Sequence, residues 1–210
     1  MINSAFFGHR PSSYKVNPIV RAFIVSEMFF WSGWNLINPI FAIFVTQNIA
    51  GGSIEAAGTA MTIYLISRIM VELMIAKSFN KIKDKTRYII SMIGIIGIGL
   101  IYLSYCFTTS LIGIFMIQVF LGIGFGIVSP VKMSLFSEHL DKGKESTEWG
   151  LYDAVTFTGM ALTATLGAFI AQRYGFRVLF FVTAIMVWLG ALPFTIFILN
   201  YKGNSTKNKV

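Results

Sequence analysis

Five ionisable side chains lie within or close to the ends of long apolar runs of this 210-residue sequence, and they are its best candidates for chemistry inside a membrane. They are Glu27, Arg68, Glu72, Lys132 and Asp153. A charge in hydrocarbon costs about 3 kcal/mol or more unless it is paired or faces water. Glu27 and Arg68 each lie about eight residues, or about 12 Å, inside their runs. We therefore expect these two to form a buried pair beside a solute pathway. The other three lie nearer the ends of their runs, where side chains reach the membrane boundary.

Polar and aromatic residues recur beside these charges at helical spacing. Glu27, Trp31, Trp34, Asn35 and Asn38 follow one another at steps of about three or four residues, which gathers them on one face of a helix. Weaker stripes of the same kind occur in three other runs. Such stripes predict either the wall of a solute pathway or hydrogen bonds that hold membrane helices together without a ligand. The side chains expected to line a solute pathway are Glu27, Trp34, Asn35, Asn38, Tyr64, Arg68, Gln118, Asp153 and Thr156.

Six apolar runs must position these side chains. They cover residues 19–49, 54–76, 88–107, 111–136, 149–171 and 178–200. About 20 helical residues cross a hydrocarbon core of about 30 Å, so each run is long enough to span a membrane. The runs are continuous and not alternating, which excludes a transmembrane β-barrel. We therefore predict an all-α integral membrane protein with six transmembrane helices, comprising a tail at 1–18, a transmembrane domain at 19–200 and a polar tail at 201–210.

The composition agrees with this fold and limits the function. Hydrophobic residues make up 55% of the chain and charged residues 12%, which does not suit a water-soluble protein of this size. The net charge is +8, but thirteen lysines and arginines fall on the side of the two termini, and only Arg173 and Arg177 fall on the other. This asymmetry predicts a multi-pass protein of the cell membrane with both termini in the cytoplasm. It explains the charge without a nucleic-acid partner.

No catalytic constellation stands out in the sequence. His9 and His139 lie outside the apolar runs, and no serine or aspartate pair is arranged for catalysis. The glycines of a nucleotide-binding loop come directly after a strand, whereas no strand is predicted before the glycines at 122–126. We therefore expect no enzymatic activity, no cofactor and no metal site.

The loop after the second run is basic and has a recurring spacing. Ala76, Asn80 and Lys81 stand where the major facilitator superfamily of secondary transporters typically has Gly, Asp and a basic residue, so this segment resembles the loop of that family. The resemblance implies a conformational latch, whereas charge alone explains the loop as a topology signal. The loop candidates are Asn80, Lys81, Asp84 and Lys85.

Three further segments extend the resemblance over nearly all six helices. Gln118, Gly122 and Gly124 stand at the places of the family pattern Arg-x-x-x-Gly-x-Gly. Residues 159–168 resemble its glycine-rich fifth helix, and residues 175–180 resemble the Gly-Trp-Arg-x-x-Phe segment that opens its sixth. The resemblance implies half of a major-facilitator-type fold with a 3+3 inverted repeat. Gln118 replaces an arginine that the family associates with proton coupling.

The function implied by the resemblance is secondary-active transport of a small solute by alternating access, with Glu27 or Asp153 as candidates for proton coupling. Transporters of the family contain two six-helix halves, so the expected partner, besides the lipid bilayer and the solute, is a second copy in a homodimer or a separate second half. The alternatives are a non-transporting membrane subunit, structural or regulatory, that retains the half-fold, and a truncated transporter. The substrate, the direction of transport and the coupling ion follow from no pattern in the sequence.

Overall fold

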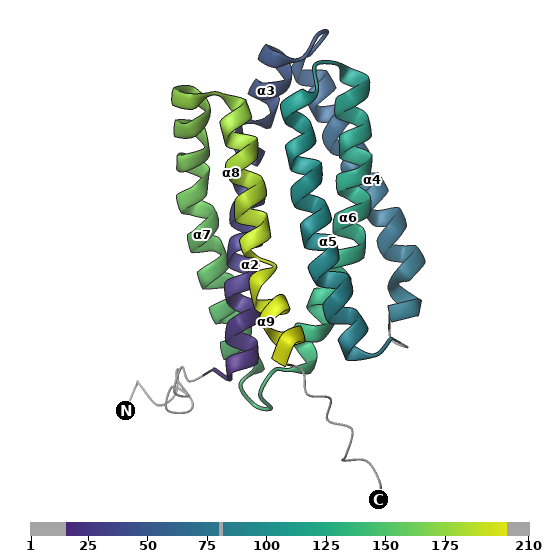
Figure 1. Ribbon diagram of the computed structural model, residues 1–210, viewed down its shortest axis with the longest axis vertical. Coiled ribbons are helices and arrows are strands. Elements are labelled where there is room, and N and C mark those ends of the chain that lie inside the picture. The colour runs from purple at the N-terminus through teal and green to yellow at the C-terminus, as the bar shows by residue number, and fades with distance from the viewer. Residues whose placement is uncertain (1–15, 80–81, 201–210) are drawn as a thin grey trace, which may run out of the picture.

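The computed structural model describes residues 16–79 and 82–200, with side chains at 16–75 and 82–196. These residues are almost entirely helical (Figure 1). The helices are α2 (Pro18–Ile37), η1 (Asn38–Ile40), α3 (Phe41–Asn48), α4 (Ile54–Phe79), α5 (Asp84–Ser104), η2 (Tyr105–Phe107), α6 (Leu111–Glu138), α7 (Glu145–Tyr174), α8 (Phe176–Leu189) and α9 (Leu192–Asn200). The predicted tails at 1–18 and 201–210 lie outside the described residues, except that residues 16–18 lead into α2.

Local sequence signals set several helix ends. The side chain of Asn17 accepts a hydrogen bond from the backbone N–H of Val20 at 2.9 Å, and Pro18 occupies the first helical turn, where an N–H needs no partner. Pro39 interrupts the first span at η1 because it has no N–H to continue the helical ladder. Gly175, with φ +86°, allows the chain to turn directly from α7 into α8.

Within the described residues, six segments are long and apolar enough to cross a membrane. They are Pro18–Asn48, Ile54–Ile75, Asp84–Phe107, Leu111–Glu138, Glu145–Tyr174 and Phe176–Ile196. The prediction of an all-α protein with six spans is confirmed. The third and fifth helices begin at Asp84 and Glu145, one turn before the predicted runs. They do so because a helix continues past its apolar residues, and an acidic side chain stabilises its N-terminus.

The six spans pack as two sets of three. In the first set α2 packs mainly against α7 and then against α8, and in the second set α6 packs mainly against α4 and then against α5. Exchanging the first three spans with the last three converts one set into the other, which is the pattern of a 3+3 inverted repeat. The sets meet where α5 packs against α8, and along a seam where α2 and α6 touch through long side chains.

Glycines allow the closest contacts within each set. A Cβ atom at Gly122 would press on the carbonyl oxygen of Tyr64 in α4, and one at Gly167 would press on the carbonyl oxygen of Leu36 in α2. Small residues at such points let helix backbones approach closely. These glycines of the family-like patterns therefore have a packing role in each set.

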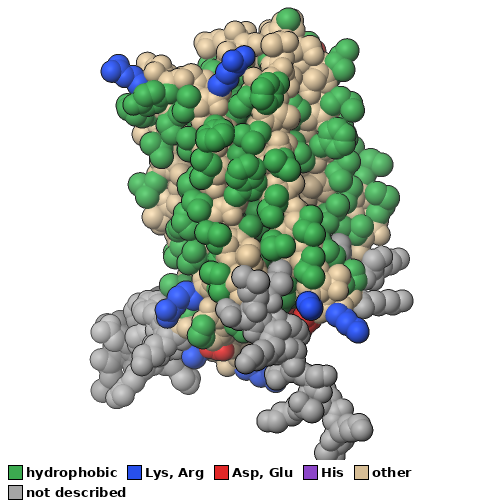
Figure 2. All heavy atoms as spheres, viewed as in Figure 1, with side chains coloured by type: hydrophobic (Ala, Val, Ile, Leu, Met, Phe, Trp, Pro, Cys, Tyr) green, Lys and Arg blue, Asp and Glu red, His purple; other side chains and the backbone are tan. Residues whose placement is uncertain are grey.

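The bundle has two distinct ends and an apolar side surface. Helix α2 begins and α9 ends at the lower end in Figure 1, which we call the terminal end. The connections α3–α4, α5–α6 and α7–α8 lie at the opposite end, which we call the far end. Apolar side chains cover the face between them (Figure 2), and residues such as Leu73, Ile112 and Leu162 are 73%, 75% and 69% exposed. A surface of this kind suits contact with lipid.

Candidate functional site

A buried carboxylate between α2, α6 and α7 organises the candidate site. Glu27 is 2% exposed, and its Oε2 accepts hydrogen bonds from Nε1–H of Trp31 at 2.9 Å and from the hydroxyl of Tyr152 at 3.1 Å. Its Oε1 forms an ion pair with Nζ of Lys132. We call these four residues the Glu27 cluster. Because Glu27 and Lys132 belong to different three-helix sets, the cluster joins the sets across the seam.

Lys132 is enclosed by the protein. We expected its side chain to reach the membrane boundary, and this expectation is wrong, because the residue is 1% exposed. Its Nζ lies 3.6 Å from the ring centre of Phe30, in a cation–π contact. Among the described residues, Nζ has no hydrogen-bond partner beyond its ion-pair contact with Glu27. A charge held in this way depends on its partner, since removing one member of a buried pair costs about 3–5 kcal/mol.

The predicted pair between Glu27 and Arg68 does not form. Arg68 Nε lies 2.8 Å from the carboxylate of Glu72, one turn along the same helix, and its Nη1 donates to the hydroxyl of Tyr64 at 3.2 Å. Equal depth places two residues at one level of the membrane but does not say in which direction their side chains point. Helix α4 packs against α6 and not extensively against α2, so Arg68 is paired within its own helix. The cation that reaches Glu27 is Lys132.

A small, mostly apolar pocket with a few polar side chains in its wall lies along the seam, on the far-end side of the Glu27 cluster. It is lined by Trp34, Asn38, Tyr64 and Gln118, all predicted from spacing, and by Tyr102 among others. Its volume is about 30 Å³, which is room for a water molecule but not for a solute. The structure thus brings four predicted side chains from three spans around one pocket. Their role in transport stays a prediction.

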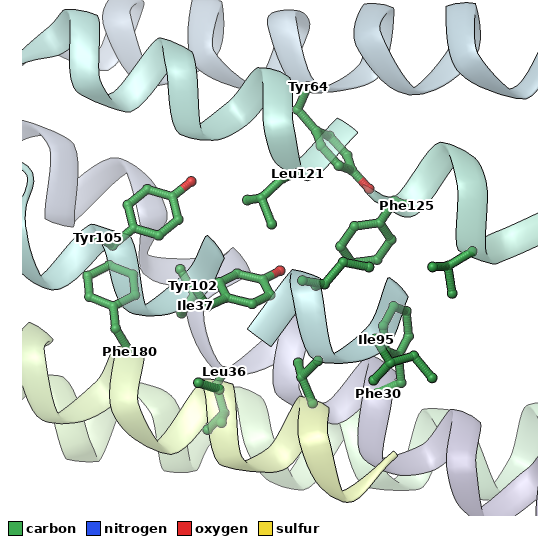
Figure 3. Packing of buried hydrophobic residues seen from close by; sticks show 14 of the residues in the cluster. Phe30, Leu36, Ile37, Tyr64, Ile95, Tyr102, Tyr105, Leu121, Phe125 and Phe180 are labelled. Atoms are coloured by element: carbon green, nitrogen blue, oxygen red, sulfur yellow. The ribbon is translucent and has the colours of Figure 1, made fainter. Parts of the chain in front are cut away.

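Aromatic rings connect the pocket with the Glu27 cluster. The rings of Trp31 and Trp34 lie 5.8 Å apart, and Phe125 lies 6.0 Å from Trp31 and 5.7 Å from Tyr64. Figure 3 shows Tyr64, Phe125 and Phe30 in succession from α4 toward α2. Because these rings are in contact, a movement of Glu27 or Lys132 would displace side chains in the pocket wall.

Three other predicted pathway residues are not gathered at the pocket. Asn35 donates from Nδ2 to the carbonyl oxygen of Met160 at 2.7 Å and so ties α2 to α7. Thr156 is 3% exposed, and its hydroxyl has no hydrogen-bond partner among the described residues. Asp153 is exposed on α7 and forms no ion pair with a described residue. The structure gives Asn35 a packing contact and leaves the expected pathway roles of all three as predictions.

The loop candidates adjoin a charge network at the terminal end. Asp84 accepts a hydrogen bond from Nη2 of Arg87 at 2.5 Å, and Arg87 also donates to both carboxylate oxygens of Glu138 at 2.6 and 2.8 Å. Bidentate contacts of this kind combine two charge-assisted hydrogen bonds and fix the orientation of the guanidinium. The network fastens the start of α5 to the end of α6. Of the remaining candidates, Asn80 and Lys81 lie outside the described residues, and Lys85 is exposed.

Sequence reasoning misses Lys132 and Tyr152 as site residues, although helical spacing contains a signal for both. Lys132 follows Gln118 and Phe125 at steps of seven residues, which places it on the same face of α6. Tyr152 lies four residues before Thr156, on the face of α7 that packs against α2. Extending the α6 stripe by one further turn would have included Lys132, and choosing Tyr152 instead of its neighbour Asp153 would have kept the face of α7 that carries Thr156.

Comparison with known proteins agrees with this architecture. The sequence pattern of the Major Facilitator Superfamily matches residues 23–210. The proton-coupled antiporter flippase LtaA of Staphylococcus haemolyticus (strain JCSC1435) is 21% identical to this chain over 178 residues. The aligned region is 80% of this chain and 42% of that protein, so the chain spans less than half the length of this relative.

Proposed function

The chain belongs to the Major Facilitator Superfamily and is a multi-pass membrane protein, and on this basis we propose that it moves a small solute by alternating access. It acts in the cell membrane with both termini in the cytoplasm, together with a second copy of itself or a separate six-helix half. The observation that carries the proposal is the buried pair of Glu27 and Lys132, which lies across the seam, with a small pocket lined in part by Asn38, Tyr64 and Gln118 further along it.

A buried ion pair is weak evidence for stability, because desolvating two charges offsets most of their attraction. Ionisable residues inside membrane spans more often mark a solute or ion pathway. Here the pair joins the two three-helix sets at a place where their backbones are not in close contact. Separation of the sets would let water reach both charges, so the pair supports a role in opening and closing the pathway.

Glu27 is the proposed proton site. A proton on Glu27 would neutralise the charge that faces Lys132 and so remove the ion pair that joins α2 to α6. Protonation and separation of the sets would then favour each other, which is the coupling that a proton-driven transporter needs. The name of the relative LtaA, a proton-coupled antiporter flippase, supports a proton as the coupling ion.

The exposed charges on α4 and α7 support a partner. Arg68, Glu72 and Asp153 lie in helices that cross the membrane, and their side chains are partly or fully exposed. Charges at such positions rarely face lipid and usually face protein or a water-filled cavity. A second six-helix half over α4 and α7 would supply that environment.

Proton-coupled flux in liposomes tests the proposal. The purified chain is reconstituted in its assembled form, a pH gradient is applied, and a lumenal pH dye is followed as solutes are added in turn. We expect solute-dependent proton movement that Glu27→Gln abolishes. Glu55→Gln, an exposed carboxylate at the far end, is the matched control and should keep it. Coupling that survives in Glu27→Gln would remove Glu27 from the mechanism. A folded assembly that moves no solute would favour a non-transporting subunit.

A further inference from the structure

Two cavities flank Arg177 at the far end of the bundle, away from the Glu27 cluster. One has a volume of about 330 Å³ and the other of about 350 Å³, and both are lined by Cys106 and Arg177. Volumes of this size are typical of small-molecule sites. Arg177 belongs to the segment at 175–180 that resembles a family motif, and the proposed transport mechanism gives it no role.

The first cavity is the polar one. Its wall includes Asn48, Thr108 and Thr109 as well as Arg177. Thr108 and Asn48 already donate to the backbone carbonyl oxygens of Ser104 and Phe44, so the guanidinium of Arg177 is the charged donor that the wall offers to a ligand. The loop that carries Thr109 is held in place, because its carbonyl oxygen accepts a hydrogen bond from the N–H of Ala50 at 3.0 Å. The polar wall therefore has a fixed position.

Aromatic side chains close the base of the same cavity. The rings of Tyr105 and Phe180 are stacked at 4.8 Å, and Phe44 lies 5.2 Å from Phe176. All four residues line the cavity. This packing joins α3, η2 and α8, so the cavity is a formed feature of the bundle and does not depend on a ligand.

The second cavity is an apolar cleft on the membrane-facing side of Arg177. Besides Cys106 and Arg177 it is lined by Phe107, Val178 and Phe181, which are 84%, 43% and 55% exposed. Apolar side chains exposed near the end of a membrane span face the part of the acyl chains that lies next to the headgroups. Arg177 thus lines both the polar cavity and the apolar cleft.

Arg177 has no acidic partner among the described residues. Of those residues, Glu55 is the only acidic one near the far end, and it lies at the start of α4 in the other three-helix set. Figure 2 shows basic and no acidic side chains at the upper end of the face it draws. The far end on the side of α7 and α8 therefore attracts anions.

We infer that this site binds an anionic phospholipid, with its phosphate beside Arg177 in the polar cavity and an acyl chain along the cleft of Phe107, Val178 and Phe181. Arginine matches phosphate through paired, charge-assisted hydrogen bonds. The cleft gives hydrocarbon an apolar surface that a soluble phosphate would leave unused. This site is separate from the proposed solute pathway, and it stands or fails independently of transport.

Retention of lipid by the assembled protein tests the inference. The chain is placed in nanodiscs of phosphatidylcholine with increasing phosphatidylglycerol, and bound lipids are counted by native mass spectrometry after release. We expect Arg177→Gln to weaken phosphatidylglycerol binding at least tenfold and Arg177→Lys to weaken it less. Arg173→Gln removes the same charge from the same end but lines neither cavity, so it should bind like the wild type. Unchanged affinity in Arg177→Gln would overturn the inference.

Two measurements separate lipid from a soluble anion and do not need the Arg177→Gln variant to fold. Phe181→Ala should reduce phosphatidylglycerol retention and leave the affinity for inorganic phosphate, measured in detergent, unchanged. The unmodified chain should retain phosphatidylglycerol in preference to phosphatidylcholine. Equal retention of the two lipids would overturn the inference, as would inorganic phosphate that binds as tightly as phosphatidylglycerol.

Discussion

Removing one charge of the Glu27–Lys132 pair should destabilise the protein more than removing both. Loss of one partner from a buried pair costs about 3–5 kcal/mol. The loss in Glu27→Gln should lie at the upper end of this range, because it leaves the enclosed Lys132 ammonium without a counter-charge. The loss of stability in Lys132→Met should lie at the lower end of this range, because Glu27 keeps its hydrogen bonds from Trp31 and Tyr152. The double variant buries no charge and should lie within about 1–2 kcal/mol of the wild type.

The free energy of unfolding in detergent micelles is the measurement, followed through tryptophan fluorescence during a denaturant titration. Glu72→Gln is the control, since it breaks the partly exposed pair with Arg68 and should cost less than about 1 kcal/mol. The reasoning is refuted if both single variants unfold within about 1 kcal/mol of the wild type. It is equally refuted if the double variant loses the sum of the two single losses, because coupling between the charges would then be absent.

Three further predictions concern topology, packing and assembly. With Cys106 replaced by serine, a cysteine at Ser53 should react with an impermeant thiol reagent added outside cells and one at Lys142 should not; the reverse pattern would contradict cytoplasmic termini. Gly167→Val should cost about 1–3 kcal/mol by forcing α2 from α7, whereas Gly150→Ala, where an added Cβ meets nothing, should not destabilise; equal stability would contradict the close approach. The mass of the active assembly in nanodiscs should exceed that of one chain, and transport by a monomer would contradict a partner.

The six spans were predictable because bilayer thickness imposes a length on each apolar run, and length is a local property of the sequence. The residues at which the spans begin and end were less predictable. Helix α5 begins at Asp84 and α7 at Glu145, since the helical hydrogen-bond ladder continues where hydropathy falls. The helix break at Pro39 was also missed, although a proline inside a run is a local signal for it.

The partners of the charges were not predictable from depth. The rotation of each helix and the choice of its neighbour decide which side chains meet, and both depend on packing between distant segments. Arg68 faces Glu72 in its own helix, while Lys132, assigned by depth to the boundary, points across the seam to Glu27. Helical spacing did gather Trp34 and Asn38, because residues on one face of one helix stay together whatever that helix packs against.

The break at Asn38–Ile40 lies where the first span begins to contact both three-helix sets. Before the break, α2 packs against α7 and α8 of its own set; after it, α3 packs against α4 of the other set and also touches α8 through Phe44 and Phe180. Rocking of one set against the other would therefore load this span. Pro39 removes a hydrogen bond there, so bending is easiest at those residues. Because Asn38 also lines the small pocket along the seam, bending at these residues would change the size of that pocket.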